Sequence, residues 1–326
     1  MPPYRQCIYY TTKYHKSPYN KQIYLFTQNI FFDIIFSKEI RMYFIVFFVL
    51  CSLATAKVSL QNCFSKKHLI TSSDVSFFTA IIFLTAALLF SPNISDTPAS
   101  VWLFSLIFAL FTVLFQLLYT KALAIGNVSL TVMLVNLSML FPITVSAVFY
   151  QEPLHFTRLI GIILTVVSFV LCIELKSKNS ISWKWFLLSV FAMLSNAGIS
   201  ITQKVFGKSS FHTENRSFVA CSYLLAFFIT LIVYGVSKIK KEPTTVLKKL
   251  PCYFFAISIG VTLAIFQWMN TYAISTIEGT FLFPSYTGGS IILSTLVGIL
   301  FFKDKLSLRQ EYSILIGMFA VILMNF

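Results

Sequence analysis

The chain is dominated by long apolar stretches that short polar segments separate. From residue 42 on there are ten such stretches: 42–62, 73–91, 101–124, 127–150, 156–175, 183–205, 217–237, 252–275, 279–302 and 308–325. A membrane-spanning α-helix needs about 20 mostly apolar residues. Lipid offers no water to bare backbone groups, so spans are helices or closed barrels, and runs this long and continuous favour helices. The pattern predicts an all-α polytopic membrane protein with ten transmembrane helices.

Composition narrows the function classes further. The chain is 57% hydrophobic and only 11% charged, whereas about a quarter of the residues of a soluble domain are charged. No folded basic domain is present that could bind nucleic acid. The net charge of +14 is therefore interpreted as loop charge that faces the cytoplasm and anionic lipid. The expected partners are a small-molecule solute and the bilayer, and a homodimer is left open.

Residues 1–41 differ from the rest of the chain. They are rich in Tyr, Ile, Phe, Asn and Lys, and the apolar run 23–36 is interrupted by polar residues. Residues 38–41 can be encoded by a purine-rich sequence like a bacterial ribosome-binding site, directly before the Met42 codon. We expect synthesis to start at Met42, with 1–41 a non-native extension; a genuine disordered basic tail is the alternative.

The second half of the chain repeats the first. Phe115-Gln116-x-x-x-Thr120-x-Ala122 returns as Phe266-Gln267-x-x-x-Thr271-x-Ala273, 151 positions later. Each half contains five of the predicted helices, the first half at 42–175 and the second half at 183–326. Because five is odd, two copies of one unit must lie in opposite orientations, which is the inverted-repeat architecture of many transporters.

Two motifs resemble a known family. The sequence at 121–126, Lys-Ala-Leu-Ala-Ile-Gly, and the run from Pro142 through Glu152 to Gly161 are similar to the EamA-type branch of the drug/metabolite transporter (DMT) superfamily. The second half follows the pattern less strictly, with Asp304 in place of the usual Glu. The resemblance implies ten helices in two EamA-like repeats and transport of small solutes, often outward.

The orientation in the membrane has two competing indications. Loops on one side carry fifteen Lys and Arg residues, against four on the other side outside the 1–41 segment. The positive-inside rule then places both termini outside, whereas the resemblance implies termini in the cytosol. The charge count is favoured here, and the orientation stays open.

Polar residues inside the spans are the candidate site, because uncompensated polar groups in lipid are costly and should face the bundle interior. Asn196, Ser200 and Gln203 fall on one helix face. The candidate substrate-binding residues are Gln116, Tyr119, Asn136, Asn196, Gln267, Asn270, Tyr286 and Ser290. Pro142 and Pro284 are expected to interrupt their helices. Interhelical hydrogen bonding without a ligand is the alternative.

Charged residues are expected only at the ends of the spans. Lys57 is assigned to the first loop, and Glu152 and Asp304 are expected to cap the helices that follow them. The six cysteines form no Cys-x-x-Cys pair and no His lies inside a span, so no metal site or cofactor is expected. No reactive cluster points to an enzyme, and no phosphate-binding loop to ATP hydrolysis.

Together these observations predict a secondary transporter of a small polar metabolite or amino-acid-like solute. The expected direction of transport is export. The transporter would work by alternating access in the cytoplasmic membrane of a bacterial cell. The alternatives are a multidrug or toxic-compound exporter and, less favoured, a non-transporting membrane assembly subunit.

Single cysteines placed in segments 208–214 and 240–249 of a chain without native cysteines test the helix count. We expect an impermeant thiol reagent to label the two positions from opposite membrane faces, because one span separates them. Labelling of both positions from the same face would contradict the ten-helix topology.

Overall fold

A computed structural model describes residues 46–57, 59–60, 71–90, 97–125, 131, 134–172, 183–240, 250–302 and 308–323. Contacts divide the chain into Met1–Phe48 and Val49–Phe326, and the interactions below lie within the second unit. The 1–41 segment and Asp304, for which the sequence made specific predictions, lie outside the described residues.

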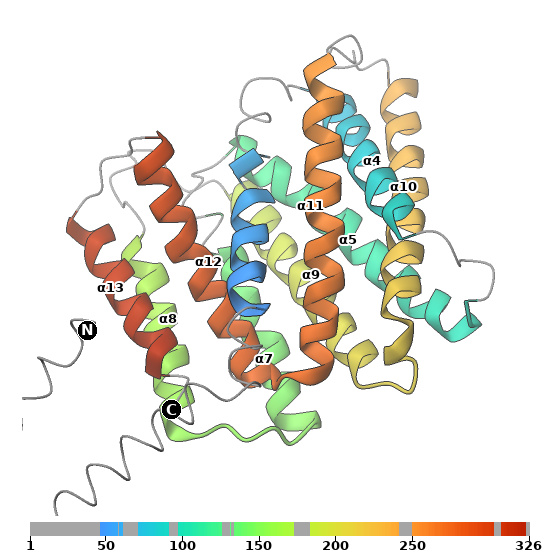
Figure 1. Cartoon of the computed structure of the whole chain (residues 1–326). Helices are drawn as coiled ribbons and strands as arrows, with labels where there is room; N and C mark the ends of the chain where they lie inside the picture. The colour runs from blue at the N-terminus through green and yellow to red at the C-terminus, as the bar shows by residue number, and fades with distance from the viewer. Residues whose placement is uncertain are drawn as a thin grey trace, which may run out of the picture. The chain divides into compact units, whose positions relative to one another are not determined.

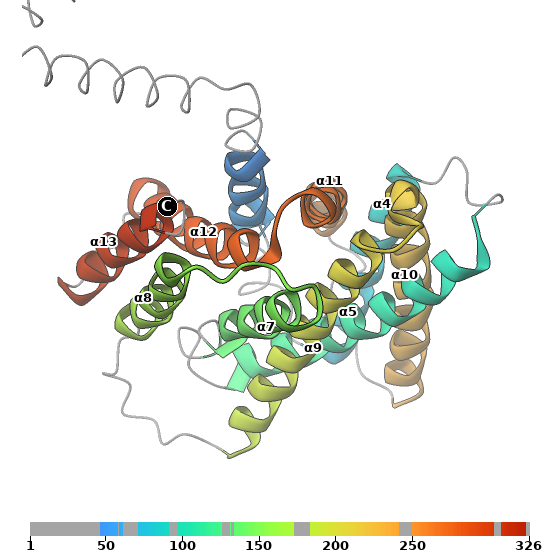
Figure 2. The ribbon, with the colours of Figure 1, turned by 90° about the horizontal axis from the view of Figure 1, so that it is seen from below.

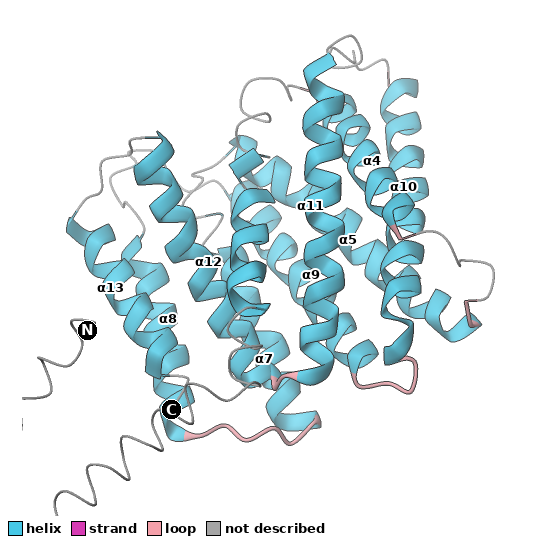
Figure 3. Cartoon of the chain, viewed as in Figure 1, coloured by secondary structure: helices cyan, strands magenta, loops and turns pink. Residues whose placement is uncertain are grey.

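Ten helices occupy the described part of the chain, which contains no strand (Figure 3). They are Val46–Lys57, α4 (Ser72–Leu89), α5 (Ala99–Ile125), a helix at Leu134–Phe149 that includes the 3-10 turn η3 (Leu137–Met139) and α7 (Leu140–Phe149), α8 (Phe156–Cys172), α9 (Trp183–Gly207), α10 (Asn215–Ile239) with the 3-10 turn η4 (His212–Glu214) before it, α11 (Leu250–Thr276), α12 (Gly279–Phe302) and α13 (Leu308–Leu323). Each falls on one of the ten apolar stretches, so the predicted fold class is confirmed.

Apolar side chains cover the outside of these helices. α5 exposes Leu103, Leu106, Leu110 and Leu114, which lie three or four residues apart and form a stripe along one face. Four helices, α5, α9, α10 and α11, are long and apolar enough to cross a membrane by themselves. Such a stripe is stable against lipid tails and unstable against water.

Helices of one half pair with their counterparts in the other half. α4, the second helix, packs along α10, the seventh; α7 packs against α12, and α8 along α13. Figures 1 and 2 both show α4 beside α10 and α8 beside α13. The contact between α5 and α10 also has its equivalent in the other half, the contact between α11 and α4. A pseudo-two-fold axis between inverted halves produces this pairing.

Two glycines allow helices from different halves to approach closely. A Cβ on Gly260 of α11 would lie 2.7 Å from the Ile82 carbonyl oxygen and from Thr85 Cβ of α4. A Cβ on Gly198 of α9 would lie 2.7 Å from the Phe111 ring of α5. Small residues at such crossings are the usual basis of close packing between membrane helices.

Hydroxyl side chains within the helices mostly satisfy themselves. The hydroxyls of Thr120, Thr165, Thr202, Thr230 and Thr271 each donate to the backbone carbonyl four residues earlier, at 2.7–2.8 Å. This local bond removes a polar group from contact with lipid without needing a neighbouring helix. Such residues are part of the scaffold, and they leave other polar groups available for a site.

A buried ion pair joins the halves at the end of the bundle where α9 ends and α12 begins. Gln151 has a φ of 50° and turns the chain after α7. Glu152 Oε2 then accepts the backbone N–H groups of Gly279, at 2.6 Å, and Thr280, at 3.3 Å. Glu152 Oε1 pairs with Lys204 Nζ, and their side chains are only 8% and 0% exposed. We call these groups the Glu152 latch.

The latch corrects one expectation from the sequence. Glu152 does not cap α8, the helix that follows it, but the N-terminus of α12 in the other half. The reason is the turn after α7, which directs the carboxylate across the axis. A carboxylate is stabilised there by the unpaired amides and the positive end of the helix dipole.

The substitution Lys204→Met tests the latch. It leaves the Glu152 carboxylate buried without its cation, which typically costs about 3–5 kcal/mol. We expect the free energy of unfolding, measured by denaturant titration of the purified protein in detergent, to fall by that amount. The exposed neighbour Lys208 is the control, and Lys208→Met should change stability by less than about 0.5 kcal/mol. Equal stability of the two variants would contradict the assignment.

Candidate functional site

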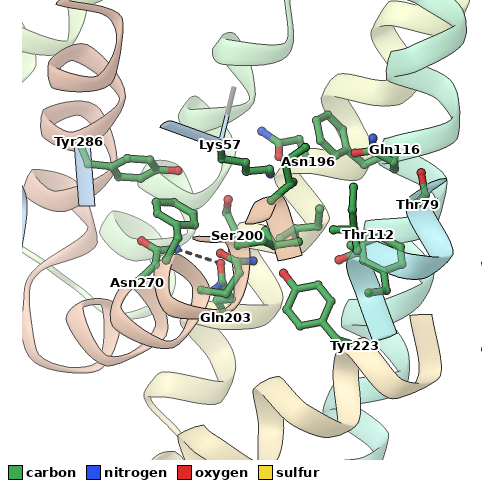
Figure 4. Close-up of a pocket in the computed structure, with 18 residues that line it drawn as sticks. Lys57, Thr79, Thr112, Gln116, Asn196, Ser200, Gln203, Tyr223, Asn270 and Tyr286 are labelled. Atoms are coloured by element: carbon green, nitrogen blue, oxygen red, sulfur yellow. Dashed lines mark hydrogen bonds between the residues drawn. The ribbon is translucent and has the colours of Figure 1, made fainter. Parts of the chain in front are cut away.

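A cavity of about 90 Å³ lies between helices of both halves. A single buried water needs about 10–15 Å³ of such space, so the cavity has room for a small solute. Figure 4 shows the 18 side chains that line it. They are Lys57, Thr79, Ile82, Phe83, Thr112, Phe115, Gln116, Asn196, Ile199, Ser200, Gln203, Tyr223, Ile259, Leu263, Phe266, Gln267, Asn270 and Tyr286.

Helical periodicity explains how the lining is assembled. On α9 the lining residues are Asn196, Ile199, Ser200 and Gln203, and on α11 they begin at Ile259 and recur every three or four residues. Residues at this spacing share one helix face. The same faces that bury apolar side chains against neighbouring helices thus also present amides and hydroxyls to the cavity.

Five of the candidate residues from the sequence lie on this cavity: Gln116, Asn196, Gln267, Asn270 and Tyr286. Gln116 and Gln267 occupy matching positions in the two repeated motifs. Their presence on a single cavity follows from the pairing of the halves, because a two-fold axis brings equivalent positions to the same centre.

Three candidates do not line the cavity. Tyr119 stacks on Phe115, with ring centroids 5.2 Å apart. Asn136 precedes η3. Ser290 donates to the Tyr286 carbonyl at 2.6 Å, and its own carbonyl accepts the Thr55 hydroxyl at 3.4 Å. Helical spacing placed Tyr119 and Ser290 on the same helix faces as other candidate residues. In the structure the Tyr119 ring stacks on Phe115, and the Ser290 hydroxyl bonds to the backbone of its own helix.

The two prolines lie near the starts of their helical segments. Pro142 is the third residue of α7, the helix that directly follows η3, so a tighter turn lies just before the proline. Pro284 lies inside α12, which continues without a break to Phe302, so the expected interruption of this helix is wrong. A proline lacks the N–H that would bond the carbonyl four residues earlier.

A hydrogen-bonded network lies on the α9–α11 side of the cavity. Gln203 Nε2 donates to Thr271 Oγ1 at 2.9 Å, and Asn270 Nδ2 donates to Gln203 Oε1 at 3.2 Å. Nearer to η3, Asn196 Nδ2 donates to Ser138 Oγ at 2.7 Å. These bonds fix the orientation of the amides. Gln203 uses both of its polar atoms, whereas Asn270 uses only its nitrogen and leaves Oδ1 without a partner among the described residues.

Several buried polar atoms on the cavity have no hydrogen-bond partner among the described residues. Thr79 Oγ1, Thr112 Oγ1, Asn270 Oδ1 and the Tyr223 hydroxyl make no hydrogen bond that satisfies the usual geometry, although the Tyr223 hydroxyl is close enough to Gln267 to interact weakly. A buried polar atom left unpaired costs about 1–3 kcal/mol. Hydrogen-bonding groups of a bound solute would remove that cost.

Six polar lining residues were not among the eight sequence candidates: Lys57, Thr79, Thr112, Ser200, Gln203 and Tyr223. Of these, Ser200 and Gln203 had been placed on the same helix face as the candidate Asn196. Lys57 corrects an expectation, because it is the last residue of helix Val46–Lys57 and lines the cavity, whereas it was assigned to a loop. The sequence did contain an indication of this, because Lys57 lies five residues before the end of the apolar stretch 42–62. A single Thr or Tyr in a span carries no comparable signal.

Comparison with known proteins agrees with this architecture. The model of the EamA-like transporter family, which belongs to the DMT superfamily, matches residues 40–173. The resemblance read from the motifs is thus confirmed over the first five helices. Over this segment the chain is therefore similar to membrane transporters of the DMT type. Among curated proteins no sequence matches the chain.

A solved structure described as "Crystal structure of protein" is similar over 86% of this chain and 94% of that chain, with a TM-score of 0.66. The sequence identity is 14%, so the likeness concerns the fold alone. Coverage this high extends beyond the first half, so the second five helices also share the fold of that solved structure.

Gln116 and Gln203 offer a matched pair of substitutions. The Gln116 side chain faces the cavity without a hydrogen bond to the described residues, whereas Gln203 is 1% exposed and bonded to two side chains. We expect Gln116→Leu to preserve stability within about 0.5 kcal/mol and to reduce counterflow of solute several-fold to about tenfold. Gln203→Leu should lower the free energy of unfolding by about 1–3 kcal/mol. If Gln116→Leu destabilised the protein and left transport per folded molecule unchanged, Gln116 would be a packing residue.

Proposed function

We propose that this chain, with its EamA-like transporter domain at residues 40–173, is a secondary transporter. It exports a small polar metabolite or amino-acid-like solute across the cytoplasmic membrane of a bacterial cell, by alternating access. One observation carries the proposal: a cavity lined by amides and hydroxyls, several of them unpaired, lies between two inverted halves. Transporters of this architecture place their binding site near the midplane, at the interface of the repeats.

The chemistry of the cavity favours a solute with both donors and acceptors. The unpaired Asn270 Oδ1 can only accept a hydrogen bond, and the hydroxyls of Thr79, Thr112 and Tyr223 can donate one. Apolar side chains such as Phe83, Leu263 and Phe266 complete the wall. A small solute with an amino or hydroxyl group beside a short carbon skeleton fits this combination.

The Glu152 latch supports alternating access. It holds the α7–α8 connection, the end of α9 and the start of α12 together. Beside it, Arg158 of α8 pairs with Glu278 and donates to Thr280 at 3.3 Å. These bonds join first-half and second-half elements at one end of the bundle, the lower end in Figure 1. Rocking of the halves would have to break them to open a path at that end.

The cavity argues against the multidrug alternative. Drug-sized ligands occupy pockets of about 300–1,000 Å³, and this cavity has about 90 Å³. Among the described lining residues there is no Asp or Glu that could neutralise a cationic drug. A non-transporting subunit offers no reason for unpaired polar groups between the halves.

The function is tested by counterflow in liposomes that contain the purified full chain. The labelled solutes are short-chain amino acids, hydroxy acids and their primary amides. We expect at least one to accumulate transiently against excess unlabelled solute. Ser200→Phe, which places a ring in the cavity, should abolish this exchange, and Ser210→Phe at an exposed turn position should not. Exchange that is equal in Ser200→Phe and wild type would show that the cavity is not the route. Absence of exchange for every solute would overturn the proposal.

A further inference from the structure

Lys57 is the one charged side chain on the cavity among the described residues. It ends helix Val46–Lys57 and is only partly exposed. Figure 4 shows its side chain reaching into the cavity next to Asn196. The remainder of the lining is uncharged, so this ammonium sets the electrostatic character of the site.

No carboxylate of the described residues neutralises Lys57. The ion pairs in this part of the chain are Arg158–Glu278 and Lys204–Glu152, both at the latch end. The lining contains no Asp or Glu. By contrast, the buried Lys204 pairs with the Glu152 carboxylate and forms part of the scaffold.

An ammonium in an apolar setting is costly unless an anion or several acceptors accompany it. In membrane proteins such ionisable residues face a polar interior and mark substrate or ion pathways. Amide oxygens on the lining could solvate the ammonium in part. Full compensation of the ammonium charge requires a negative charge close to it. A bound solute can supply that charge.

We infer that Lys57 binds an anionic group of the transported solute, and that the solute is a small organic carboxylate. This inference rests on the proposed transport function. The carboxylate would accept from the Lys57 ammonium. The hydrogen-bond donors of the solute would reach the unpaired Asn270 Oδ1 elsewhere on the wall. Short amino acids and hydroxy acids combine these features within the available volume.

The direct test compares acids with their primary amides, which have nearly the same shape and lack the charge. Wild-type protein in liposomes should exchange a labelled short-chain amino or hydroxy acid at least about tenfold faster than the corresponding amide. Comparable exchange of acid and amide would overturn the role of Lys57 while the transport function stands. Exchange of neither member of any pair would overturn the transport function itself. Because this comparison uses only wild type, it does not depend on the folding of a variant.

Variants then assign the effect to the residue. Lys57→Met should reduce exchange of the acid by about tenfold or more and leave the slow exchange of the amide unchanged. Lys57→Arg keeps the charge and should retain most of the acid preference. Lys208→Met, an exposed lysine outside the cavity, is the control and should behave as wild type. An unchanged acid preference in folded Lys57→Met would contradict the inference. So would stronger competition by a phosphate monoester than by the matched carboxylate.

Discussion

Within a bilayer every polar group must find its hydrogen-bond partner inside the protein, and this constraint organises the structure. Many helix hydroxyls, such as those of Thr165 and Thr230, bond to the preceding turn of their own helix. The charged side chains at the latch are paired across the halves. Ten buried side-chain polar atoms of the described residues have no hydrogen-bond partner, and four of them lie on one cavity together with Lys57. These four atoms and Lys57 are the groups that a bound solute could reach, and such departures from the requirements of stability are typical of functional sites.

The cavity and the latch belong to one arrangement. α9 carries Asn196, Ser200 and Gln203 along the cavity and, directly after Gln203, Lys204 of the latch. α12 begins at the latch with Gly279 and reaches the cavity at Tyr286. A movement that separates Glu152 from Lys204 would therefore also move two walls of the cavity. This physical connection through two rigid helices is what alternating access requires.

The fold was accessible from the sequence because its signal is local. A helix that crosses lipid needs a long apolar run, and the ten runs gave the ten helices within a few residues. In the first and fourth stretches, which begin at 42 and 127, the described helices begin later, at Val46 and Leu134. The repeated Phe-Gln motif also placed Gln116 and Gln267 correctly at one centre, since equivalence under the two-fold axis follows from the repeat.

The remainder depends on tertiary contacts that the sequence does not display. Tyr119 is directed by its stacking on Phe115, and Glu152 by a turn with a left-handed residue at Gln151. Tyr223 became a cavity residue because α10 packs against both α4 and α5. Helical spacing gives the face of a residue, but which helix that face meets is decided by the packing of all ten.

Under alternating access, the cavity between the halves should open in turn to each side of the membrane. The most direct measurement is the reactivity of a cysteine at position 200, in a chain without other cysteines, toward an impermeant thiol reagent added to one face at a time. The account predicts labelling from either face, with slower labelling when a bound solute occupies the cavity. Labelling from a single face under all conditions, with no effect of any transported solute, would contradict it.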